Sequence, residues 1–249
     1  MCEYVYKFYP PKDYAFKSLK NEELCFNALM NFDDKDEGKL IFQCINEKLE
    51  NYSEISFQSV ADDFALACHE AIEFHFRVLS LTNEYRSKSM WNEYAYNGSG
   101  FCVAYDKKDV EKISNICFPI EYTDINKQYD FFEKTTSDEM RQMSIQSLQR
   151  KKEKYINENE MRFICYISQD QCEPIDIIEY CNMDDKNEMA YCKPLSAKIY
   201  KSPKLIFKQC KPVHIYLGYN MNVENMEKIT EIINEHKYTY SHIKEEQLI

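Results

Sequence analysis

The chain has 249 residues, of which 44% are hydrophobic and only four are glycine, and this composition excludes a disordered or linker-rich polypeptide. We therefore expect one globular domain over residues 1–249. The net charge of −11 at pH 7 argues against nonspecific nucleic-acid binding, which relies on basic surface to displace counterions. No apolar run approaches the length of a membrane span, so we expect no membrane association.

The first residues and the cysteines predict the compartment. Met1-Cys2-Glu3-Tyr4 has neither the basic start nor the apolar core of a signal peptide, which predicts a cytoplasmic protein. Eleven cysteines in that compartment would be reduced thiols. The spacing from Cys165 to Cys192 is too wide for the tight cysteine pairs of zinc sites, and we expect no metal.

Short strands and helices alternate in the first half of the chain. Tyr4–Tyr9 alternates between aromatic and other residues and predicts a strand that Pro10-Pro11 ends. The hydrophobic spacing then predicts the following elements: a helix from Asp13 to about Asn21, a strand at Leu24–Phe26, a helix from Phe57 to Ala71, and a strand from Ile72 to about Thr82.

The second half continues in the same way and predicts an α+β fold rather than a regular parallel sheet. Residues 124–156 are polar with loose helical periodicity, which predicts a helical insertion. The other expected elements are helices at Ser87–Tyr96, Asp106–Asn115 and Val223–Glu235, and strands at Phe101–Tyr105, Phe118–Tyr122, Glu160–Ile167, Leu205–Phe207, Val213–Leu217 and Tyr238–Ile243.

The segment Asn157-Glu158-Asn159-Glu160-Met161-Arg162 contains the strongest candidate site. Glu158, Glu160 and Arg162 recur with a period of two, so in one strand all three side chains would project from the same face. Two carboxylates beside a guanidinium perturb one another's pKa values, and such clusters concentrate at functional sites. The alternative is a solvated edge strand with a surface salt bridge.

Several local motifs, in this order, resemble the bacterial family catalogued as domain of unknown function 2971. They are Tyr6-Lys7-Phe8, Phe26 to Asp34, Leu79–Thr82, Met90–Ala95, Gly100–Asp106, Glu158–Arg162 and Tyr216–Gly218. Three positions depart from the family pattern. Gly98 replaces a usual histidine, Met161 replaces a usual aromatic residue, and the acidic loop around Asp33-Asp34 lacks its proline.

The same order of motifs more distantly resembles toxin-type ADP-ribosyltransferases. Those enzymes carry a basic or polar residue on the first strand, a Ser/Thr-rich second strand and a Glu-x-Glu block on a later strand. This resemblance implies a bent or split mixed β-sheet and transfer of ADP-ribose from NAD, the substrate, to a macromolecular acceptor, either protein or nucleic acid. A toxin or antiphage effector of this kind also implies a neutralising or regulatory protein partner.

The resemblance gives each candidate residue a role. Glu160 would stabilise the oxocarbenium-like charge on the nicotinamide ribose, and Glu158 would polarise the attacking nucleophile. NAD would be held by Lys7, Ser80, Thr82, Trp91, Tyr94 and Arg162, since cationic and hydroxyl groups bind the diphosphate and aromatic rings stack on bases.

Structural explanations compete with these roles. Trp91 is also expected as a core residue, Lys7 as a lysine that extends from a strand edge, and Arg162 as the residue that orients one of the carboxylates. Two other functions fit the same residues. One is a non-catalytic ligand-sensing or interaction module with a structural Glu/Arg network, and the other is hydrolysis of a nucleotide or glycosidic bond.

Overall fold

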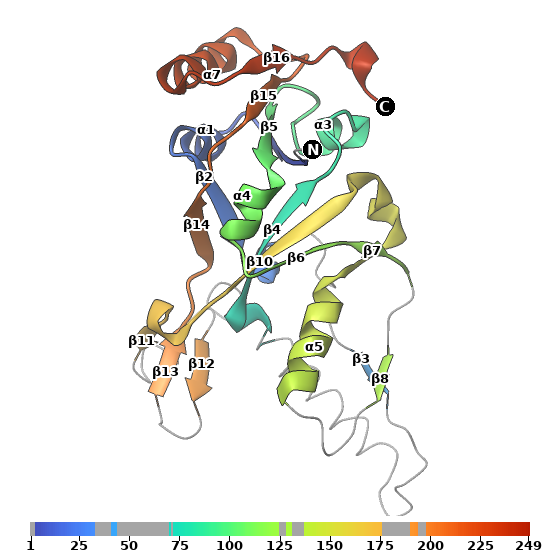
Figure 1. Cartoon of the computed structure of the whole chain (residues 1–249), viewed down its shortest axis with the longest axis vertical. Helices are drawn as coiled ribbons and strands as arrows, with labels where there is room; N and C mark the ends of the chain where they lie inside the picture. The colour runs from blue at the N-terminus through green and yellow to red at the C-terminus, as the bar shows by residue number, and fades with distance from the viewer. Residues whose placement is uncertain are drawn as a thin grey trace, which may run out of the picture.

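A sheet that contains both antiparallel and parallel strand pairs forms the centre of the computed structural model, which describes residues 3–32, 41–43, 70, 72–124, 128–130, 137–175, 190–193 and 198–249 (Figure 1). Within these residues the sheet has nine strands in the order β14-β2-β4-β1-β5-β15-β16, and β10 and β6 extend it beside β4. Among the described strands of this nine-stranded sheet, β15 and β16 pair in parallel and the other pairs are antiparallel. The strands are β1 Tyr4–Tyr9, β2 Glu23–Asn27, β4 Phe76–Thr82, β5 Phe101–Asp106, β6 Ile116–Pro119, β10 Glu160–Tyr166, β14 Leu205–Gln209, β15 His214–Leu217 and β16 Tyr240–His242.

Strand β4 is the branch point of this sheet. One edge of β4 pairs with β10 along the whole strand, from Phe76 opposite Tyr166 to Thr82 opposite Glu160. The other edge is shared, since β1 joins it where Tyr6 lies opposite Thr82 and β2 joins it at Val78. The sheet therefore divides at β4, and β1 and β2 continue on separate branches.

Helices cover both faces of the sheet, because strands buried on both faces need a packed layer on each side. Helices α1 (Asp13–Lys20), α4 (Lys107–Lys112) and α7 (Val223–His236) pack on one face with the core that contains Val5, Tyr9 and Phe163. Helix α3 (Lys88–Glu93) packs on the other face against Phe8.

Polar side chains define where these helices begin, as expected from their unpaired first amide groups. The Asp106 carboxylate accepts a hydrogen bond from the Lys108 amide at the start of α4. Ser87 and Asn222 accept equivalent bonds at the starts of α3 and α7.

Smaller elements surround the main sheet. Strands β11 (Glu173–Ile175), β13 (Lys198–Lys201) and β12 (Ala190–Lys193) form a three-stranded sheet. The remaining elements are helix α5 Ser137–Leu148, the pair β3 Ile41–Gln43 with β8 Gln128–Asp130, the pair β7 Glu121–Tyr122 with β9 Arg150–Lys151, and the 3-10 helices η1 Leu29–Asn31, η3 Glu153–Glu158, η4 Gln169–Gln171 and η5 Glu245–Gln247.

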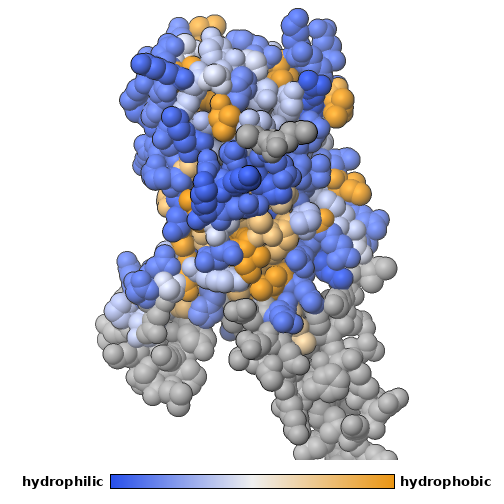
Figure 2. All heavy atoms as spheres, viewed as in Figure 1, coloured by the Kyte–Doolittle hydropathy of each residue, from blue (hydrophilic) through white to orange (hydrophobic). Residues whose placement is uncertain are grey.

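One face of the molecule is divided by its polarity. Figure 2 shows hydrophilic residues over the region of α4 and a group of hydrophobic residues below it, where Figure 1 shows β6 and β10 crossing the molecule. In the described part of the chain, no helix combines the length and the apolar character that a bilayer crossing requires.

The predicted mixed α+β fold with a large mixed sheet and flanking helices is confirmed. The strand predicted from Ile72 begins later, at Phe76, because residues 72–75 are helical. The Arg77 guanidinium donates hydrogen bonds to the carbonyl oxygens of Glu73 and Phe76 and so stabilises this change from helix to strand.

Two other predicted segments differ from the structure. The strand predicted at Phe118–Tyr122 is divided at Ile120, because β6 pairs with β10 whereas β7 pairs with β9. The segment predicted as a helical insertion contains α5, but also β8 and β9. The acidic loop at Asp33-Asp34 and, apart from Glu70, the helix predicted from Phe57 to Ala71 lie outside the described residues.

Candidate functional site

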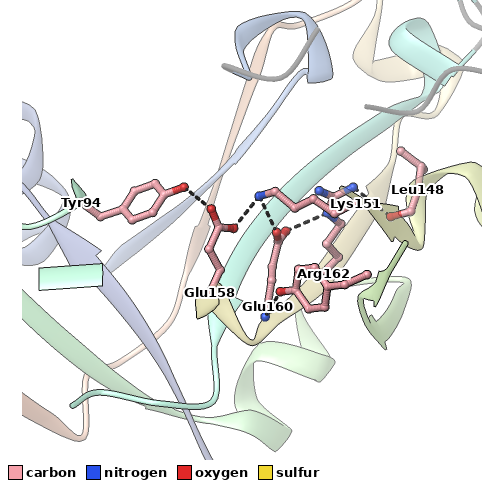
Figure 3. Close-up of polar contacts among 7 residues, drawn as sticks. Tyr94, Leu148, Lys151, Glu158, Glu160 and Arg162 are labelled. Carbon is pink, nitrogen blue, oxygen red and sulfur yellow. Dashed lines mark hydrogen bonds and ion pairs between the residues drawn. The ribbon is translucent and has the colours of Figure 1, made fainter. Parts of the chain in front are cut away.

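Two carboxylates share one ammonium group at the start of β10 (Figure 3). Lys151 Nζ donates hydrogen bonds to Glu158 Oε2 at 2.5 Å and to Glu160 Oε2 at 3.0 Å. Arg162 Nε donates to the other oxygen of Glu160 at 2.7 Å, and the Tyr94 hydroxyl donates to Glu158 Oε1 at 2.7 Å. The cluster therefore contains two anionic and two cationic groups and is balanced in charge.

The backbone at Asn159 brings the two carboxylates together. Glu160 and Arg162 lie on the same face of β10, as predicted, but Glu158 is the last residue of η3 and not part of the strand. Asn159 has the left-handed conformation, with φ 43° and ψ 50°, which asparagine adopts more readily than most residues. This turn directs Glu158 toward Lys151, so the prediction that all three residues lie on one strand is wrong for Glu158.

The site is buried in the sheet and not on a solvated edge. Strand β10 lies between β4 and β6, and the side chains of Glu160 and Arg162 are 3% and 0% exposed. Arg162 also donates to the Leu148 carbonyl oxygen at 2.9 Å, and the Tyr122 hydroxyl accepts a hydrogen bond from the Glu160 amide at 2.7 Å. The alternative of a surface salt bridge on an edge strand is therefore wrong.

The environments of the two carboxylates shift their pKa values in opposite directions. Burial raises the pKa of Glu158 above its ordinary value, and the hydrogen bonds from Lys151 and Tyr94 only partly offset this. Burial also opposes ionisation of Glu160, but Arg162, Lys151 and a hydrogen bond with Ser80 outweigh it and lower the pKa of Glu160 to about 2. Glu160 is thus a fixed anion, whereas Glu158 is the carboxylate that takes up a proton more easily.

Three of the predicted NAD-binding residues lie in this cluster or beside it. Tyr94 and Arg162 bond the carboxylates directly, and Ser80, which lies opposite Arg162 in the β4–β10 register, bonds Glu160. Thr82 lies opposite Glu160 but is 1% exposed, and its hydroxyl accepts a hydrogen bond from the Glu84 amide.

Lys7 and Trp91 lie apart from the hydrogen-bonded cluster. Lys7 lies on the same face of β1 as Val5 and Tyr9, since the three residues are two positions apart. This is the sheet face opposite to that of Glu160 and Arg162. Burial lowers the pKa of Lys7, and among the described residues it has no hydrogen-bond or ion-pair partner. Trp91 is fully buried, packs edge-on against Phe8 with ring centroids 5.2 Å apart, and has no free face for a base.

The sequence interpretation missed two residues of the site. Lys151 stands in the charged run Arg150-Lys151-Lys152-Glu153-Lys154, where nothing in the sequence distinguishes it from its neighbours. Pairing of β9 with β7 turns it inward, and only 8% of its side chain is exposed. Tyr122 was predicted as the end of a strand, and its hydroxyl is the part that reaches Glu160.

Comparison with known proteins shows that the segment with most of this site is similar to a described family. Residues 90–163 match the model of the family described as "Protein of unknown function (DUF2971)", and this segment contains most of α3, all of β5, Lys151 and the whole of Glu158–Arg162. The match covers 74 of the 249 residues, and over this segment the chain is similar to the DUF2971 family. No curated protein and no solved structure matches the chain. The DUF2971 segment includes every residue of the hydrogen-bonded cluster except Ser80.

A hollow of about 440 Å³ occurs in another part of the molecule. It lies between β16 and the start of α7 and is lined by Tyr219, Met221, Met226, His242 and neighbouring residues. None of the eight residues predicted from the sequence lines it, so the candidate site rests on the charged cluster and not on this hollow.

Proposed function

We propose that this chain transfers ADP-ribose from NAD to a macromolecular acceptor, with Glu160 and Glu158 as its catalytic carboxylates. The observation that carries the proposal is the opposite pKa shift of two carboxylates that share Lys151. Pairs of acidic groups whose environments separate their pKa values are typical of sites with two distinct acid–base roles. The divided sheet at β4, with Ser80 beside Glu160, agrees with the split sheet of the ADP-ribosyltransferases that the motif order resembles.

The reaction assigns a different task to each carboxylate. The bond between nicotinamide nitrogen and the ribose carbon breaks, nicotinamide leaves with the electron pair, and positive charge develops on the ribose ring. Glu160, which remains ionised, stabilises this charge. The acceptor's nucleophile then bonds to the same carbon and gives its proton to Glu158, whose raised pKa suits a base that must accept a proton.

The remaining residues of the cluster position these two groups. Arg162 fixes one oxygen of Glu160, and Lys151 holds the second oxygen beside Glu158. Tyr94 donates to the far oxygen of Glu158 from α3, where 38% of this tyrosine is exposed. Since Glu158 bonds to the exposed Tyr94, we assign the side of the acceptor to Glu158 and Tyr94. A toxin or antiphage effector is the biological role that this chemistry suggests, and its neutralising partner would cover the same side.

A second function is favoured by the completeness of the network. Both oxygens of Glu160 and of Glu158 accept hydrogen bonds, and each charge is compensated by a neighbour. Such a buried network also suits a non-catalytic ligand-sensing module in which the four charged residues fix the junction of η3 and β10. The two functions differ in whether NAD is consumed.

The test is incubation of the purified chain with NAD, with and without a cell lysate, and measurement of free nicotinamide. Transfer predicts release of nicotinamide together with label from adenine-labelled NAD on a macromolecule of the lysate. If label appears only as free ADP-ribose, the acceptor is water and the chain is a hydrolase. Absence of nicotinamide in both reactions would favour the non-catalytic module.

A further inference from the structure

Three tyrosines gather on the same sheet face as Glu160. The rings of Tyr85 and Tyr216 stack with centroids 4.3 Å apart, and the Tyr6 ring lies 5.3 Å from Tyr85 and 6.2 Å from Tyr216. The Arg86 guanidinium lies over the Tyr85 ring at 5.2 Å, and its Nε donates to the Tyr85 hydroxyl at 2.9 Å. We call these four residues the tyrosine cluster.

The tyrosine cluster is joined to the carboxylates through the loop between β4 and α3. Tyr6 lies opposite Thr82, which in turn lies opposite Glu160, so two strand spacings, about 10 Å, separate Tyr6 from Glu160. The Asn83 amide donates to the Asn159 carbonyl oxygen at 3.3 Å, at the turn between the two carboxylates. Tyr85 and Arg86 follow in the same loop.

Trp91 fixes the position of this loop. Its indole Nε1 donates to the Tyr85 carbonyl oxygen at 2.8 Å, and the Ser87 hydroxyl at the start of α3 donates to the Asn157 carbonyl oxygen at 3.4 Å. The tryptophan that the sequence suggested as a base-stacking residue therefore acts as a positioning residue for Tyr85.

The tyrosine cluster has polar groups that are available to a ligand. Tyr6 is 9% exposed, yet among the described residues neither its hydroxyl nor that of Tyr216 has a hydrogen-bond partner. Neither hydroxyl oxygen is among the buried unpaired polar atoms of the described residues, so both reach the surface and are open to a ligand. Within the described part of the chain, the terminal amino groups of Arg86 make no ion pair, so its planar fork is available to a phosphate.

We propose that Tyr6, Tyr85, Tyr216 and Arg86 bind the adenosine diphosphate part of a dinucleotide whose other end lies at Glu160. Arg86 pairs with the diphosphate, the tyrosine rings contact the adenine, and the hydroxyls of Tyr6 and Tyr216 bond its polar edge or the ribose. The two ribose rings and the diphosphate of a dinucleotide can cover the separation between Tyr6 and Glu160. Because the bound group would be the ADP part of NAD, this subsite rests on the proposed function.

The experiment is calorimetric titration of the full chain with ADP, which contains no nicotinamide and therefore probes the subsite without the reaction. The variants are Arg86→Gln, Tyr216→Phe and, as a matched control, Lys112→Gln. Lys112 is an exposed cation on α4, which covers the opposite face of the sheet. We expect wild type and Lys112→Gln to bind ADP equally, and Arg86→Gln to raise the Kd about tenfold through loss of a charge-assisted bidentate pair.

Tyr216→Phe removes only a hydroxyl and is expected to raise the Kd several-fold while the melting temperature stays within a few degrees. Failure of folded wild type to bind ADP, or equal binding by Arg86→Gln, would overturn the subsite. The two proposals fail separately. ADP binding without nicotinamide release would support the subsite and contradict the proposed transferase activity. Nicotinamide release without ADP binding would contradict the subsite and support NAD cleavage.

Discussion

Glu158 and Glu160 share the ammonium group of Lys151, although Glu158 ends a 3-10 helix and Glu160 begins a strand. The left-handed turn at Asn159 makes this possible. In a continuous strand the two side chains would project in parallel and would not converge on one ammonium group. The turn is therefore the structural origin of the site.

Substitution of Asn159 tests this origin. Asn159→Gly should leave stability nearly unchanged, since glycine adopts the left-handed conformation without penalty. Asn159→Ala should lower the free energy of unfolding by about 1–2 kcal/mol, the usual penalty of a Cβ in this conformation. Urea denaturation of both variants measures the difference. Equal stability of the alanine and glycine variants would show that this turn stores no strain.

Removal of Lys151 tests whether the two carboxylates depend on it. Lys151→Met should destabilise the fold by about 3–5 kcal/mol, because it leaves two buried carboxylates with fewer cationic partners. Addition of Glu158→Gln should recover part of this loss, with a coupling of about 0.5–3 kcal/mol in a double-mutant cycle.

The matched control is Lys112→Met, which removes an exposed ion pair with Asp109 on α4. This change should alter stability by no more than about 0.5 kcal/mol, the usual range for surface substitutions. Strictly additive effects of Lys151→Met and Glu158→Gln would contradict an energetic link between these two residues.

The pH dependence of stability should show the lowered pKa of Glu160. Its ionisation stabilises the folded state fully above its unfolded pKa of 4.5, and this contribution is lost as the pH falls toward the folded pKa of about 2. The difference in unfolding free energy between wild type and Glu160→Gln should therefore stay constant above pH 4.5 and narrow below it. Thermal unfolding from pH 7 to pH 2.5 measures this, and a difference independent of pH would refute the ion pairing of Glu160.

Ionisation of Glu158 should lower the free energy of unfolding, whereas ionisation of Glu160 raises it. Burial raises its pKa, so its ionisation opposes folding, and this unfavourable contribution grows as the pH rises through its unfolded and then its folded pKa. Glu158→Gln should be less destabilising than Glu160→Gln at pH 7, which the same denaturation experiments measure. A larger loss in Glu158→Gln would reverse the assignment of the two environments.

The fold was largely predictable because its signals are local. Strand β1 alternates aromatic residues with other residues, and β5 is a short apolar run that ends at Asp106. Ser87 and Asp106 cap their helices as their sequence positions indicate. Element boundaries failed where a buried residue decides them through distant contacts. At Phe76 the deciding residue is Arg77, whose guanidinium also donates to the Pro203 carbonyl oxygen.

The site was only partly predictable, because its geometry depends on contacts between distant segments. The sequence identified Glu160, Arg162 and Tyr94, but a period of two could not reveal the turn at Asn159 or the inward position of Lys151. The burial of Glu160 between two cationic partners was not visible in the sequence either, and it leads us to expect that Glu160→Gln destabilises the fold.

The most direct test of the central claim is the rate of nicotinamide release from NAD by wild type, Glu160→Gln and Glu158→Gln. All three are measured with lysate acceptors, below the melting temperature of the least stable variant, with circular dichroism to confirm folding. We predict release by wild type, a loss of at least about 100-fold in Glu160→Gln, and continued release without transfer to the acceptor in Glu158→Gln. Release by folded Glu160→Gln at the wild-type rate, or no release by wild type, would contradict the catalytic role of Glu160.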